Sequence, residues 1–275
     1  MSTTPSRDRL SRRPDRPVGP AAARATSNTG PRLAEGGRSK ESGRMSRDTV
    51  QPDVVLVPAP DHGVWRLGKA KNPVKYERIS QEDWSRTGGN RWSLVSYDIL
   101  YCASRHDGCF AEALAPFRVD PKMREVIGDE WTKPSFMTPG KIPRDWTTRH
   151  ILVRLQLPKE ARFLDVDDER TLETLSRELK DELAEQGVDR LTTEHIQGFN
   201  RRITRQISAW AITQRTGPSE QERLIHGIAY RSRFGMRQCW AVFNDVELKQ
   251  EETSLIFPES EALRRVAEEY DLTML

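Results

Sequence analysis

The carboxylate of Glu112 is one of a few side chains in this sequence whose position suggests chemistry. It lies within residues 104–116, where Phe110 and Leu114 are spaced as neighbours on the apolar face of a helix. A helix turns about 100° per residue, so Glu112 lies about 200° from Phe110. The carboxylate therefore points away from the core, either into bulk water or into a cleft.

The hydroxyl of Ser232 stands in an otherwise apolar row. Side chains alternate between the two faces of a strand, so Ser232 would share one face with Ile228, Tyr230 and Phe234. A buried hydroxyl needs a hydrogen-bond partner. Two interpretations follow: Ser232 bonds a neighbouring backbone group, or it lines a pocket.

Two arginines, Arg66 and Arg91, each lie next to a tryptophan, Trp65 and Trp92. Such a pair can be a guanidinium stacked on an aromatic ring at the surface. It can also be an anion clamp beside an apolar surface of the size of a base. The pattern is compatible with both arrangements.

Common catalytic and metal-binding motifs do not occur in the sequence. There is no GxSxG or HExxH motif, and no GK[ST] follows the glycines at positions 88 and 89. The three cysteines form no CxxC pair, and the five histidines are scattered, so no metal site is expected. An enzyme with this sequence would have to use arginine, tyrosine, carboxylate and hydroxyl groups.

The composition indicates a soluble protein. Of its 275 residues, 36% are hydrophobic and 31% are charged. No apolar run approaches the roughly 20 residues of a membrane helix. No apolar segment of a secretory signal follows the first arginines. With so few cysteines, we expect a location in the reducing cytoplasm.

Residues 1–50 differ from the rest of the chain. They contain no Trp, Phe, Tyr or Ile, and their eleven Lys/Arg against five Asp/Glu give a net charge of +6. The remaining 225 residues therefore carry −3 of the overall +3. Such a segment buries too little apolar surface to fold, so we expect a disordered Arg/Ser/Pro/Gly-rich tail before a globular domain at residues 51–275. The tail is either a solvated extension or an electrostatic arm for an anion.

The remaining pattern predicts a mixed α+β fold. Strands are predicted over residues 97–103, 150–157, 227–234 and 239–243, the last two as a hairpin. Helices are predicted over 104–116, over 172–183 with a stop at Gly187, over 203–211 with a stop at 217–218, and over 263–270. Residues 118–149 show no period and are expected to form a long surface excursion. Because strands and helices do not alternate regularly, we expect a mixed or antiparallel sheet with flanking helices.

Taken in order, several stretches resemble the RES domain family. They are VWR at 64–66, GNRW at 89–92, ILYCAS at 99–104, FAEAL at 110–114, GIAYRSRF at 227–234 and CWAVF at 239–243, with the helix at 202–210. The resemblance spans about residues 64–245. It implies a fold similar to that of the ADP-ribosyltransferases and an enzyme that consumes NAD⁺. It also implies, for many members, a toxin paired with a helix-turn-helix antitoxin of the Xre type.

Carried over by position, the family's site residues correspond to Arg66, Tyr101, Glu112 and Ser232, with Arg91 as a further candidate. In this assignment Arg66 clamps the pyrophosphate of NAD⁺ bidentately, and Tyr101 stacks on the nicotinamide ring. Glu112 stabilises the positive charge that develops on the sugar when the nicotinamide–ribose bond breaks. Ser232 binds the ribose or the amide. NAD⁺ is then a substrate, and no metal is required.

Several alternatives remain at this level. Arg78, Arg86 and Arg91 lie near enough to Arg66 to replace it as the clamp. Phosphate, water or a protein side chain could accept the ADP-ribose, the last giving a mono-ADP-ribosyltransferase. A non-catalytic nucleic-acid-associated protein using residues 1–50 would be expected to interleave aromatic with basic residues, and that segment has no aromatic residue. In the toxin interpretation, nucleic acid is contacted only through the antitoxin.

Overall fold

The computed structural model describes residues 52–84, 89–127, 140–216 and 222–275. All of them belong to one compact unit, residues 47–275. The predicted tail at 1–50 lies outside the described residues, so it stays a prediction. Among the described residues, no helix combines the length and apolar character needed to cross a membrane.

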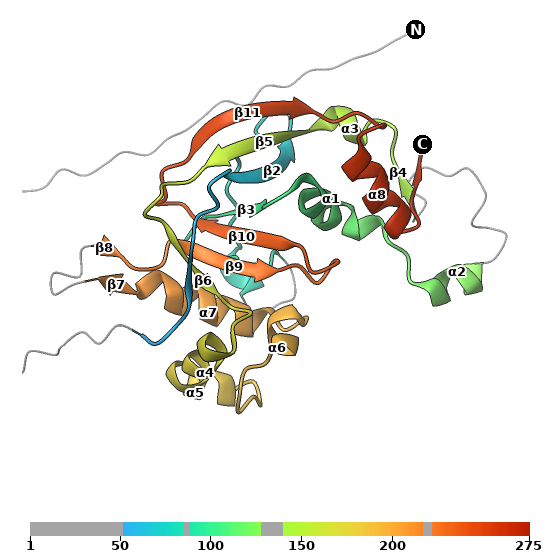
Figure 1. Ribbon diagram of the computed structural model, residues 1–275. Coiled ribbons are helices and arrows are strands. Elements are labelled where there is room, and N and C mark those ends of the chain that lie inside the picture. Colours follow the sequence, from blue (N-terminus) through green and yellow to red (C-terminus); the bar gives the residue numbers. More distant parts are fainter. Residues whose placement is uncertain (1–51, 85–88, 128–139, 217–221) are drawn as a thin grey trace, which may run out of the picture. The chain divides into compact units, whose positions relative to one another are not determined.

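An eight-stranded mixed sheet forms the centre of this unit (Figure 1). Its strand order is β1-β6-β9-β10-β3-β2-β5-β11, and all neighbouring pairs are antiparallel except the parallel pair β6–β9. The strands are β1 Leu56–Pro58, β2 Val64–Lys69, β3 Ile99–Ala103, β5 His150–Gln156, β6 Arg162–Asp165, β9 Gly227–Arg231, β10 Gln238–Phe243 and β11 Lys249–Leu255. The predicted mixed α+β class is confirmed.

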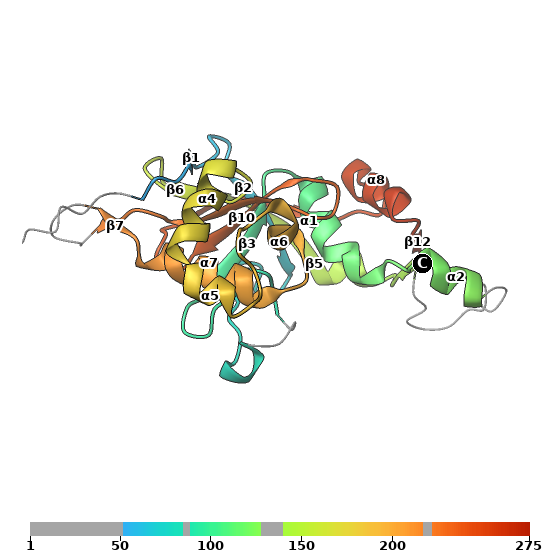
Figure 2. The ribbon, with the colours of Figure 1, turned by 90° about the horizontal axis from the view of Figure 1, so that it is seen from below.

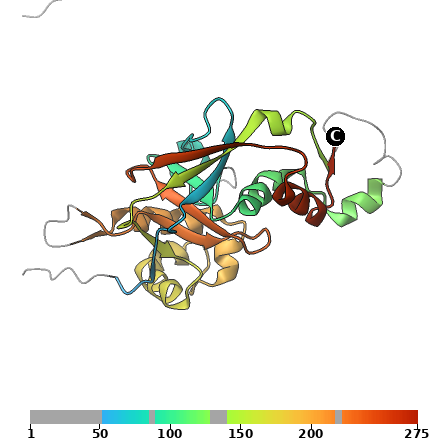
Figure 3. The same ribbon diagram turned by 45° about the horizontal axis from the view of Figure 1, so that its top comes forward.

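Two groups of helices flank the sheet. The first contains α4 Glu169–Glu178, α5 Lys180–Ala184, α6 Thr193–Gln197 and α7 Arg201–Thr213, which lie over strands β9, β10 and β3 when seen from below (Figure 2). The second contains α1 His106–Leu114 and α8 Glu261–Glu269, which pack beside each other (Figure 3).

The remaining elements are short. They are the helices α2 Pro121–Ile127 and α3 Trp146–Arg149, the 3-10 turns η1 Gln81–Asp83 and η2 Ala115–Phe117, and the strand pairs β4 Lys141–Ile142 with β12 Thr273–Met274 and β7 Arg215–Thr216 with β8 Glu222–Arg223.

The sheet is weakest between β2 and β3. Only Trp65 and Ala103 are in register there, whereas β2 pairs with β5 over six residues. In Figure 1, β2, β5 and β11 arch over the rest of the sheet on one side of this junction. The guanidinium of Arg66 donates a hydrogen bond to the carbonyl of Tyr101 at 3.0 Å and so links the two strands where their main chains part. The sheet therefore opens at the position of two predicted site residues.

Apolar clusters cover both faces of the sheet. Successive residues of a strand point to opposite faces, and β5 illustrates this, since Val153 and Leu155 join one cluster while Leu152 joins the other. The larger cluster includes the buried apolar side chains of α1, α4, α7 and α8. The predicted common face of Ile151, Val153, Leu155 and Leu157 is confirmed by their shared cluster.

Most of the predicted elements are confirmed with shifted ends. The strand at 97–103, the helix that follows it, the hairpin and the C-terminal helix correspond to β3, α1, β9–β10 and α8. The helix predicted over 172–183 is two helices, α4 and α5, which meet at Leu179, although its four leucines are all buried. Helix α7 ends at Thr213, before the predicted stop at 217–218, which lies outside the described residues.

The prediction for residues 118–149 was wrong in part. Ile142 is 1% exposed and Trp146 is 3% exposed, so the end of this segment is in the core and not at the surface. Strands β2, β6 and β11 were also missed. Strand β11, with the sequence KQEETSL, is a mostly exposed edge strand, and its polar residues, which protect an edge from further pairing, hide the strand period.

Candidate active site

A cavity of about 190 Å³ opens where β2 and β3 part. Its walls come from β2, β3, α1, β9 and β10, and from the connection between β2 and β3. It is lined by Arg66, Leu67, Glu77, Asn90, Tyr101, Cys102, Ala103, Gly108, Cys109, Glu112, Ala113, Tyr230 and Cys239. Three predicted site residues from three separate elements are thus brought to one place.

Glu112 and Ser232 meet at the edge of this cavity. Helix α1 buries Phe110 and Leu114 and leaves Glu112 exposed, as its spacing predicted. The hydroxyl of Ser232 donates a hydrogen bond to Glu112 Oε1 at 2.5 Å, across 120 residues of sequence. The carboxylate is therefore held in one orientation while it remains open to solvent.

The hairpin turn after β9 fixes Ser232, which is fully buried. Its N–H donates to the carbonyl of Arg237 at 2.8 Å, and its carbonyl accepts from the N–H of Met236 at 3.0 Å. Its hydroxyl also accepts from the N–H of Phe234 at 3.0 Å. The interpretation that Ser232 bonds a neighbouring backbone group is confirmed. Ser232 does not itself line the cavity, but it bonds Glu112, which does.

Arg66 lines the cavity from β2 and has a carboxylate partner of its own. Its Nη2 lies 3.1 Å from Glu77 Oε1, and its side chain is only 13% exposed. Nη2 also lies 3.4 Å from the carbonyl of Lys75, and Asn90 donates a hydrogen bond to the other oxygen of Glu77. The charge of Arg66 is therefore largely neutralised by Glu77.

Two tyrosines supply flat walls. The hydroxyl of Tyr101 accepts a hydrogen bond from the N–H of Trp92 at 3.0 Å and bonds the hydroxyl of Ser93 at 2.9 Å. These bonds hold the hydroxyl of Tyr101 to the Trp92 segment, so it is the aromatic ring that lines the cavity. Burial raises the pKa of Tyr101 and of Tyr230, so both phenols are neutral near pH 7.

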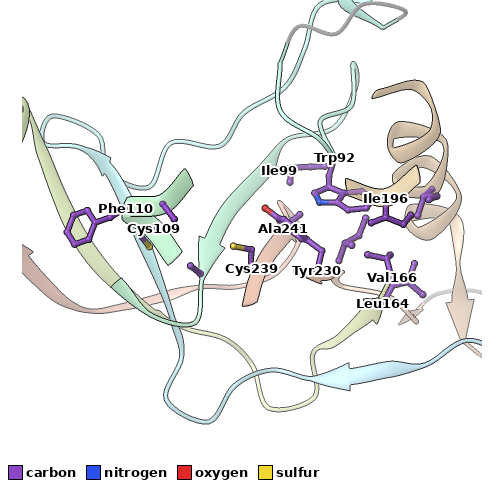
Figure 4. Packing of buried hydrophobic residues seen from close by; sticks show 14 of the residues in the cluster. Trp92, Ile99, Cys109, Phe110, Leu164, Val166, Ile196, Tyr230, Cys239 and Ala241 are labelled. Carbon is purple, nitrogen blue, oxygen red and sulfur yellow. The ribbon is translucent and has the colours of Figure 1, made fainter. Parts of the chain in front are cut away.

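All three cysteines line the cavity, and all three are free thiols. Figure 4 shows Cys109 of α1 and Cys239 of β10 within the buried cluster that also contains Tyr230. Burial raises the pKa of Cys102 to about 12 and raises the pKa of Cys109 and Cys239 as well. As neutral thiols they act as small apolar wall residues rather than nucleophiles.

Arg91 does not line this cavity. It is 7% exposed, and its Nη1 donates to the carbonyl of Ile196 at 2.6 Å, so it ties the segment before β3 to α6. Its guanidinium carbon lies 5.9 Å from the centre of the Tyr230 ring. Arg91 thus stands behind a wall residue of the cavity.

Sequence reasoning did not predict that Tyr230 and Glu77 line this cavity. A signal for Tyr230 was present, since period two places it on the same strand face as Ser232. Glu77 lies among ordinary charged and polar residues, and only the fold brings it to Arg66. Within the described ranges, no group of three or more His, Cys, Asp or Glu is placed to hold a metal ion.

Comparison with known proteins bears on this site. A search of the curated proteins found no match. One similar solved structure is the crystal structure of the M. tuberculosis MbcT–MbcA toxin–antitoxin complex, with 11% sequence identity and a TM-score of 0.40 over 79% of this chain and 91% of that chain. The family model of the RES domain matches residues 63–258, well over half of the 275 residues, and includes the whole predicted stretch from 64 to 245. This chain belongs to the RES domain family.

Proposed function

We propose that this protein is an enzyme that consumes NAD⁺ by cleaving the bond between nicotinamide and ribose. One observation carries the proposal. Arg66, Tyr101 and Glu112 line one cavity, and Ser232 bonds Glu112 at 2.5 Å, although these residues are far apart in the sequence. Membership of the RES family, whose resemblance implied these same positions, also supports it.

The size of the cavity favours one end of the dinucleotide. At about 190 Å³ it is smaller than the roughly 300–1,000 Å³ pockets that enclose drug-sized ligands. It suits a nicotinamide ring between flat and small walls, with the rings of Tyr101 and Tyr230 and the thiol of Cys239 beside it. The ribose would then lie at the mouth, near Glu112.

This arrangement suits a reaction that builds positive charge on a sugar. When nicotinamide leaves, the ribose becomes similar to an oxocarbenium ion. A carboxylate fixed beside it stabilises that charge without having to reorganise. Ser232 holds Glu112 Oε1, so the second carboxylate oxygen remains for the ribose hydroxyls or for the incoming nucleophile.

We also propose that the enzyme is the toxin of a toxin–antitoxin pair in the cytoplasm, because many RES family members have this role. Its partner would be a helix-turn-helix protein of the Xre type that covers the mouth of the cavity. Nucleic acid would then be contacted through the antitoxin only. The exposed position of Glu112 agrees with a site that a partner can cover.

One assay tests the catalytic proposal. The purified protein is incubated with NAD⁺, with and without inorganic phosphate, and the products are identified by mass. Free nicotinamide is the expected product in either case. ADP-ribose, ADP-ribose phosphate or an ADP-ribosylated protein would identify water, phosphate or a side chain as the acceptor. Intact NAD⁺ after prolonged incubation with folded protein would refute the proposal.

The toxin proposal needs a cellular test. Induction of this chain in bacteria should lower cellular NAD⁺ and stop growth, and co-expression of the adjacent gene, if it encodes a helix-turn-helix protein, should restore both. Normal growth at high levels of active enzyme would show that the protein is not a toxin, and would leave the NAD⁺ chemistry untouched.

A further inference from the structure

Arg91, Arg201 and Arg233 form a cationic cluster behind and beside the cavity. In the part of the chain that the structure describes, none of the three forms an ion pair with Asp or Glu. Some arginines elsewhere in the unit do have such partners: Arg66 pairs with Glu77, and Arg223 pairs with Asp245.

Contacts between α6, α7 and the hairpin turn bring these arginines together. Arg91 bonds the carbonyl of Ile196 in α6, and Gln197 Nε2 lies 3.4 Å from the sulfur of Met236 in the turn. Arg233, next to Ser232, lies 4.6 Å above the ring of Phe199 in the α6–α7 connection. Arg201 is the first residue of α7.

Two of these guanidinium groups have unused donors. Nη1 of Arg201 and Nη1 of Arg233 are buried and have no hydrogen-bond partner among the described residues. A buried donor without a partner costs free energy, more so when it is charged. Arg201 also lies at the N-terminus of a 13-residue helix, where the helix dipole favours an anion and disfavours a cation.

The charges act on one another. Burial, and then the nearby charges of Arg91 and Arg233, lower the pKa of Arg201 to about 10. Burial and Arg91 also lower the pKa of Arg233, against the opposing effect of Glu112. A bound phosphate would relieve the mutual repulsion of these three guanidinium groups, of which Arg201 lies at the N-terminus of α7.

We propose that Arg201 and Arg233, supported by Arg91, bind the phosphate groups of the nucleotide substrate. This inference rests on the proposed function, which gives the substrate a pyrophosphate next to its ribose. The position fits that connectivity, because Arg233 follows the serine that bonds Glu112, and Arg201 is close enough to Tyr101 for its charge to act on that phenol. The ring would enter the cavity, and the pyrophosphate would remain at its rim.

The same geometry makes Arg66 less suited than Arg201 and Arg233 to bind the pyrophosphate. Its Nη atoms are already engaged by Glu77 and by the carbonyls of Tyr101 and Lys75. To clamp a pyrophosphate, Arg66 would have to exchange a carboxylate for a phosphate. Arg201 and Arg233 need no such exchange.

The test compares Arg201→Gln, Arg233→Gln and the double variant with Arg202→Gln as the control. Arg202 lies in the same turn of α7 and pairs with Glu185, so its replacement removes the same charge from outside the cluster. Isothermal titration measures the binding of ADP-ribose, inorganic pyrophosphate and nicotinamide to each protein. Thermal denaturation is recorded without ligand, and NAD⁺ turnover is followed in parallel.

We expect each cluster variant to weaken ADP-ribose and pyrophosphate binding about tenfold and to leave nicotinamide binding unchanged. The Tm without ligand should stay the same or rise, since repulsion is removed, and pyrophosphate should raise the Tm of the wild type but not of the double variant. Unchanged affinity for ADP-ribose in the double variant would overturn the inference, as would a lower Tm with normal affinity. An inactive wild type that binds pyrophosphate through Arg201 and Arg233 would refute the proposed function alone.

Discussion

The walls that α1 and β2 give to the cavity use their charged residues in opposite ways. On α1, Glu112 is exposed and is held by a neutral hydroxyl, so its negative charge stays available. On β2, Arg66 is nearly buried and faces Glu77, so its positive charge is already compensated. In the proposed function the Glu112 side carries the chemistry, whereas Arg66 links β2 and β3 where their pairing ends.

Replacing Glu112 by Gln should have the largest effect. The change keeps the size of the side chain and removes its charge, and groups of this kind typically contribute about 10²–10³-fold to turnover. NAD⁺ turnover should therefore fall by about that factor. The exposed position predicts a change in stability within about 0.5 kcal/mol.

Glu182→Gln, at an exposed position of α5, is the matched control for Glu112→Gln and should keep full turnover. Relief of any growth arrest by Glu112→Gln, with normal protein levels, would support the same conclusion in cells. Full activity of a well-folded Glu112→Gln protein would remove Glu112 from the site.

Ser232→Ala should have the next largest effect. It removes the bond to Glu112 and leaves the N–H of Phe234 without its acceptor, so we expect about tenfold lower kcat and about 1 kcal/mol lower stability. In the Glu112→Gln background the same change should have little further effect on kcat, because the two residues act as one unit. Additive losses of kcat would show that Ser232 acts on the substrate by itself.

Arg66→Lys distinguishes support from direct clamping. Lysine keeps the charge but cannot reach Tyr101, Lys75 and Glu77 together, so stability should fall by about 1–3 kcal/mol, and the KM for NAD⁺ should rise only several-fold. A large loss of NAD⁺ affinity at unchanged Tm is the outcome expected of a pyrophosphate clamp instead. Glu77→Gln sharpens the distinction. If Arg66 clamps the pyrophosphate, the change frees its charge and should improve the affinity for NAD⁺. If Arg66 supports the fold, the change should lower the stability.

A smaller effect is expected on the pH dependence of stability, through His226, which lies outside the cavity. Burial lowers the pKa of His226 below its usual value of 6.5, and its Nδ1 accepts the N–H of Arg162 at 3.1 Å. The unfolded chain then binds this proton more readily than the folded protein, so stability is lost as the pH falls below about 6.5. The Tm should drop between about pH 7.5 and about pH 5.5, and His226→Gln should show a smaller drop. An identical drop in that variant would assign the pH dependence to other groups.

The smallest effect is expected from removing the N-terminal residues. A protein that starts at Met45 should keep its fold and its NAD⁺ turnover, because residues 1–44 contain almost no core-forming side chains. Circular dichroism and the NAD⁺ assay measure both properties. Loss of folding in this shorter protein would show that the N-terminal segment is part of the domain.

Local pattern was enough to predict the direction of several side chains. The spacing of Phe110 and Leu114 placed Glu112 off the core, and the hairpin period placed Ser232 among buried residues. Both depend only on helix and strand periods, which adjacent residues determine. The RES resemblance, now supported by the family match over 63–258, added the order in which the site residues occur.

The tertiary structure decided which of these residues are partners. Ser232 bonds Glu112 across 120 residues, and Arg66 has Glu77 as a partner where the sequence had suggested a free clamp. Arg201 and Arg233 carried no local signal, since an arginine in a helix or a turn looks solvated until its neighbours are known. Charge pairing depends on distances of a few ångströms between segments remote in sequence, and here the parting of β2 from β3 and the packing of α7 against β9 set those distances.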